Sequence, residues 1–210
     1  MVASDAANAD AQMPRTEEAQ LIARAQRGRP EAFRALVSAY QQRLYGFVWR
    51  LVRDHHEAED VCQAAFVKAY ESLASYSAEY AFSTWLFTIA YRVALNNMRK
   101  RKALTGDVDF SRFDAGSDAA ADSVANTEEA RRMRELVWTA VDDLTPVQKS
   151  TVLLFYKENK SCQTIGEILG IPAVTVKSHL HRAREKLRGA LEAQLADGWG
   201  TIRFNDAASA

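Results

Sequence analysis

SCQTIGEILGIPAVTVKSHLHRAREKLR, residues 161–188, predicts two helices joined by a tight turn. Ser161 supplies a side-chain oxygen that can cap the first helix, and Gly170 can end it because glycine tolerates the backbone conformation found at helix C-termini. Pro172 suits the start of the second helix, where its missing N–H would have no partner in any case. An apolar face then recurs every three or four residues along the second helix, formed by Val176, Leu180, Ala183 and Leu187.

The opposite face of this second helix is rich in hydrogen-bond donors and positive charge. Its side chains suit phosphates and base edges, and they are Thr175, Lys177, Ser178, His179, His181, Arg182, Arg184 and Lys186. A short helix, a turn with glycine and a basic second helix are the parts of a DNA-binding helix-turn-helix. The alternative for this stretch is an ordinary helical hairpin with a solvated basic face.

Length and composition are those of a soluble globular chain. The 210 residues are 48% hydrophobic and 26% charged with a formal net charge of zero, so nucleic-acid binding would depend on local charge. No apolar run of about 18 residues occurs, and the acidic, polar N-terminus is unlike a signal peptide. We therefore expect a cytoplasmic protein without membrane insertion.

The two cysteines, Cys62 and Cys162, lie a hundred residues apart and have no metal-ligand spacing. Each is most simply a small buried apolar group, and a redox role for either stays open. The neighbouring His55 and His56 do not share a helix face, which argues against a metal site there. We expect no cofactor.

The apolar pattern predicts an all-α fold of two small helical domains. We expect a disordered tail over 1–18, a first domain over 19–102, a flexible linker over 103–127, a second domain over 128–195 and a C-terminal tail over 196–210. The linker has five aspartates against one arginine and no persistent period, which is typical of a flexible acidic segment.

In the first domain a helix is predicted from about 55 to 74, with Asp54 as its cap and Glu57 in the capping-box position. Four acids lie at this opening: Asp54, Glu57, Glu59 and Asp60. They suit the positive end of the helix dipole. The same acids could also form a docking surface for a partner protein.

The next helix, residues 82–102, combines aromatic residues with cations. Trp85, Leu86, Ile89, Ala90 and Val93 can face a core, and we expect Phe82, Phe87 and Tyr91 to leave aromatic surface beyond what one side buries. Residues 99–102 (RKRK) form a cationic cluster that would suit a helix C-terminus. Aromatic rings beside cations also suit single-stranded nucleic acid, whose bases stack while its phosphates are neutralised.

In this order the stretches resemble the bacterial RNA polymerase sigma factors of the sigma-70 family, and the absence of extra domains resembles their small extracytoplasmic-function (ECF) group. The resemblance covers about residues 18–193. Residues 54–70 are similar to region 2.2, 82–102 to regions 2.3 and 2.4, 143–156 to region 4.1 and 161–188 to region 4.2.

The resemblance implies a fold, partners and site residues. Region 2.2 would dock on the coiled coil of the polymerase β′ subunit through Glu57, Glu59, Asp60, Gln63 and Phe66. Regions 2.3 and 2.4 with the preceding loop would melt the minus-10 element through Tyr80, Phe82, Trp85, Arg92, Asn96 and Arg99. Region 4.2 would bind the minus-35 duplex through Thr175, Lys177, Ser178, His179, His181 and Arg182. The β flap of the polymerase and an anti-sigma factor are further implied partners.

Five positions depart from the family's usual pattern. Two of them, His179 and His181, stand where larger or cationic side chains are frequent. Arg92 and Asn96 stand where asparagine and aspartate are frequent, so the base preference of the minus-10 helix would differ. Gly166 stands where alanine is usual. A glycine inside a helix lowers stability by about 0.5–1 kcal/mol relative to alanine, and here it could allow close helix packing.

Two other classes of function remain as alternatives. A conventional helix-turn-helix regulator would bind duplex DNA without polymerase core, and it explains residues 161–188 equally well. It does not explain the acidic helix followed by the aromatic and basic helix. An enzyme is not expected, because the sequence has no glycine-rich phosphate loop, metal cluster or nucleophile elbow.

Overall fold

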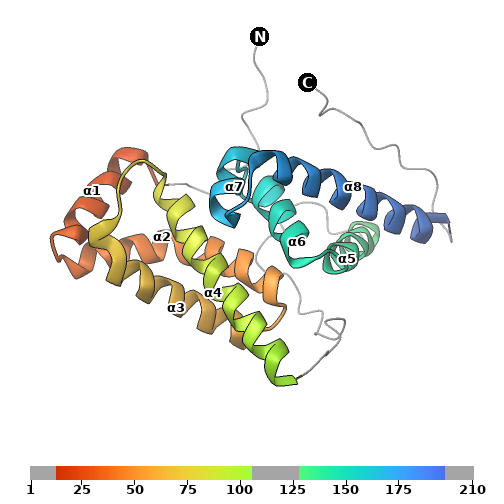
Figure 1. The fold of residues 1–210 in the computed structure, drawn as a ribbon, viewed down its shortest axis with the longest axis horizontal. Helices are drawn as coiled ribbons and strands as arrows, with labels where there is room; N and C mark the ends of the chain where they lie inside the picture. The colour runs from red at the N-terminus through yellow and green to blue at the C-terminus, as the bar shows by residue number, and fades with distance from the viewer. Residues whose placement is uncertain (1–12, 106–127, 197–210) are drawn as a thin grey trace, which may run out of the picture. The chain divides into compact units, whose positions relative to one another are not determined.

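The computed structural model describes residues 13–105 and 128–196, and all regular structure within these two ranges is helical (Figure 1). The helices belong to two compact units, one on each side of residues 106–127. This confirms the predicted all-α fold. The expected tails and most of the expected linker lie outside the described residues, although the helices extend to Arg15, Thr105 and Ala196 at their outer ends.

In the described residues of the first unit there are four helices and one short 3-10 turn. They are α1 (Arg15–Gln26), α2 (Pro30–Val52), α3 (His55–Ser72), η1 (Leu73–Ser75) and α4 (Phe82–Thr105). α2, α3 and α4 pack on one another, and α1 packs on α2 (Figure 1). Apolar residues at helical spacing meet in the middle of this bundle, and fully buried examples are Leu36, Leu44, Val61, Leu86 and Phe87.

The connection between α2 and α3 is short because two residues end one helix and start the next. Arg53 adopts a left-handed conformation (φ 57°) after α2, and Asp54 Oδ1 then accepts a hydrogen bond from the Glu57 N–H at 2.8 Å. The predicted Asp54 cap is therefore confirmed. The Glu57 carboxylate pairs with Arg101 instead of completing a capping box with the Asp54 backbone.

Three of the four aromatic residues of α4 lie in the core, so the aromatic surface expected from them is wrong. Phe82, Phe87 and Tyr91 are 1%, 0% and 4% exposed. The physical reason is that α4 packs against both α2 and α3, and two neighbours cover a wider face than one. Trp85 and Ile89, which were expected to face the core, are only half-buried.

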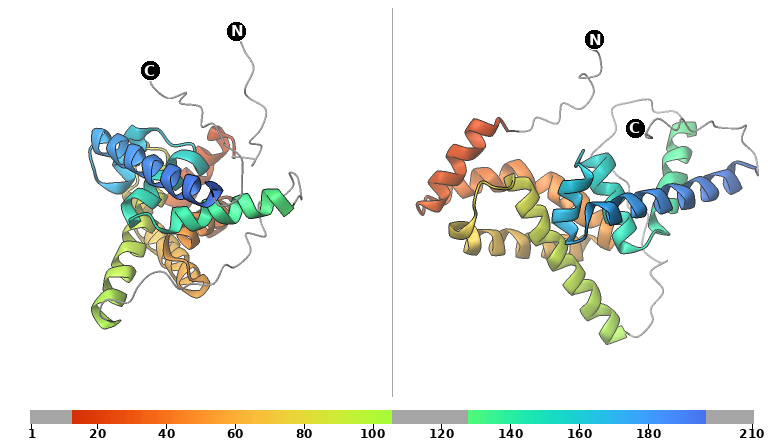
Figure 2. Two further views of the ribbon diagram at one scale, coloured as in Figure 1. Left: turned by 90° about the vertical axis from the view of Figure 1, so that its right-hand side faces the viewer. Right: turned by 45° about the horizontal axis from the view of Figure 1, so that its top comes forward.

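The second unit contains the remaining helices. They are α5 (Glu128–Asp142), α6 (Pro146–Val152), the π-helical turn η2 (Leu153–Lys157), α7 (Cys162–Leu169) and α8 (Ala173–Ala196). α5 and α6 pack on α8, which runs as one continuous helix to Ala196 (Figure 2). The π-helical turn has no counterpart among the elements expected from the sequence.

A capping box starts α6. Thr145 Oγ1 accepts from the Gln148 N–H, and Gln148 Oε1 accepts from the Thr145 N–H at 3.2 Å. Pro146 occupies the first helical position, where it breaks no hydrogen bond.

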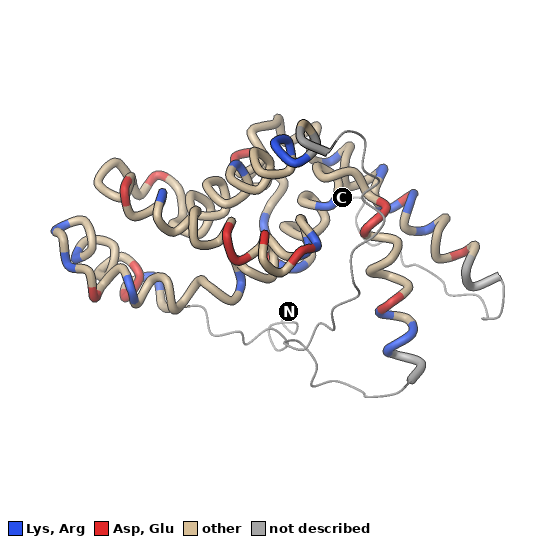
Figure 3. Tube along the Cα trace, turned by 90° about the horizontal axis from the view of Figure 1, so that it is seen from below, with Lys and Arg blue, Asp and Glu red and all other residues tan. Residues whose placement is uncertain are grey.

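Charge is interspersed over both units, as Figure 3 shows for the described residues, and this agrees with a net charge of zero. None of the helices described is both long enough and apolar enough to span a membrane.

Candidate functional site

The helix-turn-helix forms with the predicted caps. Ser161 Oγ accepts from the Thr164 N–H at 3.1 Å, and Gly170 ends α7 in the left-handed conformation (φ 70°). A backbone hydrogen bond closes the turn, in which the Ile171 N–H donates to the Gly166 carbonyl at 3.0 Å. These bonds fix the start of α8 relative to α7.

Gly166 is required by the backbone of this turn. A Cβ atom at position 166 would lie 2.6 Å from the carbonyl oxygen of Ile171, a distance that real Cβ atoms do not tolerate. Close helix packing was expected at Gly166, whereas the nearest atom in the structure is a backbone oxygen of the turn. Alanine at this position would force the turn away from α7.

The two faces of α8 are separated as predicted. Val176, Leu180 and Ala183 are buried on one face. Four of the six predicted DNA-binding residues are exposed on the other: Lys177, Ser178, His181 and Arg182.

Thr175 and His179 lie at the edges of this exposed face and are half-buried. The Nδ1 atom of His179 is buried and has no hydrogen-bond partner in the described chain, so this histidine turns partly toward the protein. Arg184 is held at the protein surface, because its Nε donates to the Tyr156 hydroxyl at 2.9 Å and its guanidinium lies over the Phe155 ring. Arg184 is therefore less available to DNA than the sequence suggested.

An exposed basic row runs along α4. Arg92, Asn96 and Arg99 are all exposed and follow one another at spacings of four and three, so they lie on one side of the helix. Phe82 was predicted to join them, but its buried side chain cannot stack on a base without leaving the core. Trp85 is half-buried and packs on Tyr76, with ring centroids 5.1 Å apart.

The loop before α4 carries Tyr80, which is 49% exposed. Tyr76 donates from its hydroxyl to the Tyr80 carbonyl at 2.7 Å. Gln26 on α1 donates from Nε2 to the carbonyls of Leu73 and Tyr76, both at 3.0 Å. Gln26 thus anchors the start of this loop, and sequence reasoning missed it because its partners lie 47 and 50 residues away.

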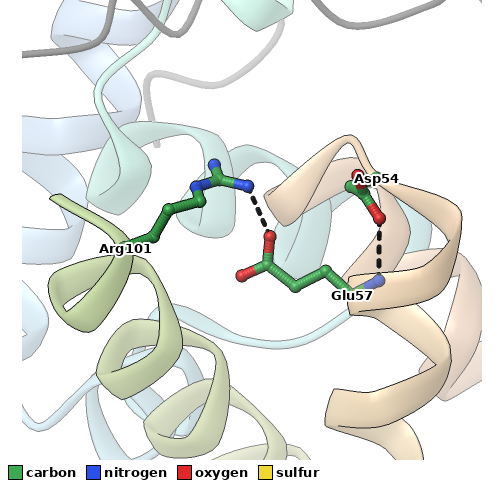
Figure 4. Close-up of polar contacts among 3 residues, drawn as sticks. All are labelled: Asp54, Glu57 and Arg101. Carbon is green, nitrogen blue, oxygen red and sulfur yellow. Dashed lines mark hydrogen bonds and ion pairs between the residues drawn. The ribbon is translucent and has the colours of Figure 1, made fainter. Parts of the chain in front are cut away.

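The acidic opening of α3 divides into two groups. Glu59, Asp60 and Gln63 are exposed, and Phe66 is half-buried. Glu57 instead points to α4, where its Oε2 accepts from Arg101 Nη1 at 2.6 Å (Figure 4). Burial raises the pKa of Glu57, and the Arg101 charge opposes this only in part. We therefore remove Glu57 from the candidate docking surface.

Two exposed apolar residues on α3 were missed by the sequence analysis. Val67 and Tyr70 continue the row that starts with Asp60 and Gln63, at spacings of three, four and three. Exposed apolar side chains beside exposed acids are typical of a protein-binding surface. The signal that could have found them is this spacing, which puts all four residues on one helix face.

The cysteines and histidines form no metal site in the part of the chain that the structure describes. Cys62 is buried, and burial raises the pKa of its thiol to about 12. A thiol that stays protonated is a poor nucleophile, which argues against the redox role left open for Cys62.

Comparison with known proteins identifies both units. Residues 36–104 match the family model "Sigma-70 region 2", and residues 134–187 match "Sigma-70, region 4". The RNA polymerase sigma-H factor of Pseudomonas aeruginosa is 34% identical over 187 residues, which cover 86% of this chain and 97% of that protein. The chain belongs to the sigma-70 family.

Its place among the ECF sigma factors is supported by further relatives. The ECF RNA polymerase sigma factor SigW of Bacillus subtilis is 31% identical over 180 residues, covering 81% of this sigma factor and 94% of SigW. The ECF RNA polymerase sigma-E factor of Escherichia coli K12 is 32% identical, with 80% and 90% covered. The resemblance predicted from the four sequence stretches is confirmed.

Solved structures support the fold of this sigma factor. The sigma factor RpoE of Bartonella quintana, in complex with the anti-sigma factor NepR, superimposes with a TM-score of 0.63 at 24% identity and covers 76% of this chain and 96% of that one. CnrH, in complex with the cytosolic domain of CnrY, gives a TM-score of 0.62 at 21% identity, covering 84% and 98%. At these identities the similarity concerns the fold.

Proposed function

We propose that this sigma factor binds the RNA polymerase core and directs promoter recognition, strand opening and transcription initiation. The proposal rests on the observation that one chain has two separate surfaces suited to binding DNA and one surface suited to binding a protein. α8 and α4 supply the first two, and α3 supplies the third. A conventional helix-turn-helix regulator would need only the surface on α8.

The exposed face of α8 is proposed to enter the major groove of the minus-35 element. Lys177 and Arg182 supply positive charge toward phosphates or guanine, and Ser178 and His181 lie between them. The buried face opposite holds the helix on α5 and α6. Thr175 and His179, at the edges, suit the phosphate backbone better than base edges.

The first unit is proposed to open the minus-10 element. Arg92, Asn96 and Arg99 would follow the phosphates of the non-template strand along α4, and Tyr80 would stack on an unpaired base next to them. Trp85 lies half-exposed behind the loop, where it supports Tyr76. Stacking matters here because a base that leaves the duplex loses its neighbours, and an aromatic ring replaces one of them.

The α3 surface is proposed to dock on the β′ coiled coil of the polymerase. Its exposed acids are Glu59 and Asp60, and its apolar part is Phe66, Val67 and Tyr70. A mixed surface of this kind gives orientation through charge and affinity through apolar burial. The second unit would bind the β flap. In this proposal the sigma factor carries out no reaction of its own.

An anti-sigma factor is proposed as a regulatory partner. The support is that the structural neighbour RpoE was solved in complex with the anti-sigma factor NepR.

Reconstituted transcription tests the proposed function. Purified protein would be added to sigma-free core polymerase with a library of promoter fragments, and permanganate would detect unpaired thymines. Initiation with an opened region is the expected result. Tight binding to duplex DNA by the protein alone, without association with core polymerase, would replace the proposal with the regulator alternative.

A further inference from the structure

Val174 is an apolar side chain at the centre of the exposed face of α8. It is 69% exposed, more than any other large hydrophobic side chain that the structure describes. It lies four residues before Ser178 and seven before His181, so the three side chains share one line along a helix of about 3.6 residues per turn. Val176 and Ala183 are buried on the other side.

The folded chain alone gives no reason for a valine at this position. Its side chain is turned away from the core of the second unit, so its burial contributes little to folding. Valine is also a weaker helix former than alanine, because its branched side chain is restricted in a helix. A contact outside the chain would explain the residue better than its packing does.

The surroundings of Val174 indicate the nature of that contact. Val174 is the second residue of α8, and N-terminal residues of the second helix contact base edges in helix-turn-helix complexes. Lys177, Ser178 and His181 are exposed beside it. Ser178 Oγ donates to the Val174 carbonyl at 3.2 Å, so this hydroxyl proton is already used within the helix.

The major groove contains one apolar feature that a valine can contact. Thymine carries a C5-methyl group there, whereas the other base edges present hydrogen-bond donors and acceptors. The polar side chains around Val174 suit phosphates and those donors and acceptors, but they have no favourable contact with a methyl group. The side chain of Val174 can make this apolar contact.

We propose that Val174 contacts the C5-methyl group of a thymine in the minus-35 element and so determines part of the promoter specificity. This inference rests on the proposed function, because it assumes that α8 lies in the major groove of promoter DNA. It adds a specificity residue that the sequence analysis did not include.

Replacing thymine with deoxyuridine tests the contact, since the change removes the methyl group and keeps the base pairing. Promoter fragments selected by the reconstituted holoenzyme would be remade with one deoxyuridine at each thymine of the minus-35 element, in either strand. At one position the wild-type holoenzyme should bind about fourfold more weakly, the effect expected when one methyl-sized apolar contact is lost.

Two variants assign that effect to Val174. Val174→Ala should bind the thymine promoter about as weakly as wild type binds the deoxyuridine promoter, and it should not distinguish the two. Lys177→Ala should weaken binding to both promoters and keep the wild-type ratio between them, because a charge contact is insensitive to the methyl group. Val174 is exposed and alanine favours helices, so the variant will fold.

The outcomes separate this inference from the proposed function. The methyl contact is overturned if the wild-type holoenzyme binds the thymine and deoxyuridine promoters equally at every position. It is also overturned if Val174→Ala keeps the wild-type ratio of affinities for the two promoters. A protein that never forms a holoenzyme or never protects a minus-35 element overturns the proposed function itself. That second result appears before any deoxyuridine is introduced.

Discussion

Arg101 Nη1 lies 2.6 Å from Glu57 Oε2, and this ion pair joins the C-terminal part of α4 to the first turn of α3. The side chains are 28% and 15% exposed, so water screens the pair less than it would at the surface. One interaction therefore connects the helix proposed to bind the polymerase with the helix proposed to open DNA. Its energetics can be tested without either partner.

Arg101→Gln should destabilise the protein by about 1–2 kcal/mol at neutral pH, between the values typical of exposed and buried pairs. The pKa of Glu57 is higher in the folded protein than in the unfolded chain, so the protonated carboxyl favours the folded state. This stabilisation is present below the unfolded pKa and is lost as the pH rises through the folded pKa. Removing Arg101 raises this pKa further. The loss of stability should therefore shrink as the pH falls to about 4, as measured by urea unfolding.

Two variants serve as controls for the ion pair. Glu57→Gln should be at least as stable as wild type at neutral pH, because burial outweighs the Arg101 attraction at this carboxyl. Arg131→Gln breaks an exposed pair with Glu135 (3.7 Å) and should lose no more than about 0.5 kcal/mol. Equal losses in Arg101→Gln and Arg131→Gln would contradict the importance of the partly buried pair.

Gly166→Ala should destabilise the second unit by about 1–3 kcal/mol, because its Cβ would meet the Ile171 carbonyl at 2.6 Å. Gly189→Ala is the matched control, since its Cβ meets nothing within 4 Å and alanine is the better helix former. Gly189→Ala should therefore raise the stability slightly. Thermal unfolding of the two variants measures the difference, and a stable Gly166→Ala would mean that the turn can move.

Gln26→Ala should impair strand opening and leave minus-35 binding unchanged. The substitution removes two hydrogen bonds to the Leu73 and Tyr76 carbonyls, each with a net contribution of about 0.5–1.5 kcal/mol, so the loop carrying Tyr80 becomes less ordered. Permanganate reactivity should fall several-fold, while footprints over the minus-35 element stay the same. Gln20→Ala, at an exposed position of α1, should behave as wild type.

Asp60→Lys should prevent association with core polymerase, because it reverses an exposed charge on the α3 surface. Glu57→Gln should associate normally, since Glu57 is engaged with Arg101. Co-elution with core polymerase on a sizing column distinguishes the variants. If Asp60→Lys also co-elutes, the docking surface lies elsewhere on the protein.

Phe82→Ala and Tyr80→Ala should fail in different ways, although the sequence suggested one role for both. Phe82 is fully buried, and its truncation should lower the free energy of unfolding by about 3–5 kcal/mol. Tyr80 is half-exposed, so Tyr80→Ala should keep the stability and reduce permanganate reactivity. Unfolding curves and footprints on the same two proteins test this. If Tyr80→Ala lowers the free energy of unfolding, the role of Tyr80 is to stabilise the fold.

Local features of the fold could be predicted because their partners lie within a few residues. The caps at Asp54 and Ser161 and the left-handed Gly170 are of this kind. The apolar spacing on α8 also predicted its buried face, since a helix repeats at a known period.

Features that depend on contacts between distant segments were missed. The Glu57–Arg101 pair spans 44 residues, and no local pattern indicates which charges will meet. The burial of Phe87 and Tyr91 follows from two helices packing on α4, whereas the spacing within α4 suggested one. Val174 was overlooked because a single exposed valine has significance only once its face is known.

The cysteines described above have a practical consequence for spectroscopy. The chain contains two, one in each unit, and Cys62 is buried with a pKa near 12 while Cys162 in the first turn of α7 is partly accessible. A maleimide dye at neutral pH would therefore attach to Cys162 and spare Cys62. The native chain thus provides its own single labelling position within the helix-turn-helix, so fluorescence can follow promoter binding without engineered cysteines.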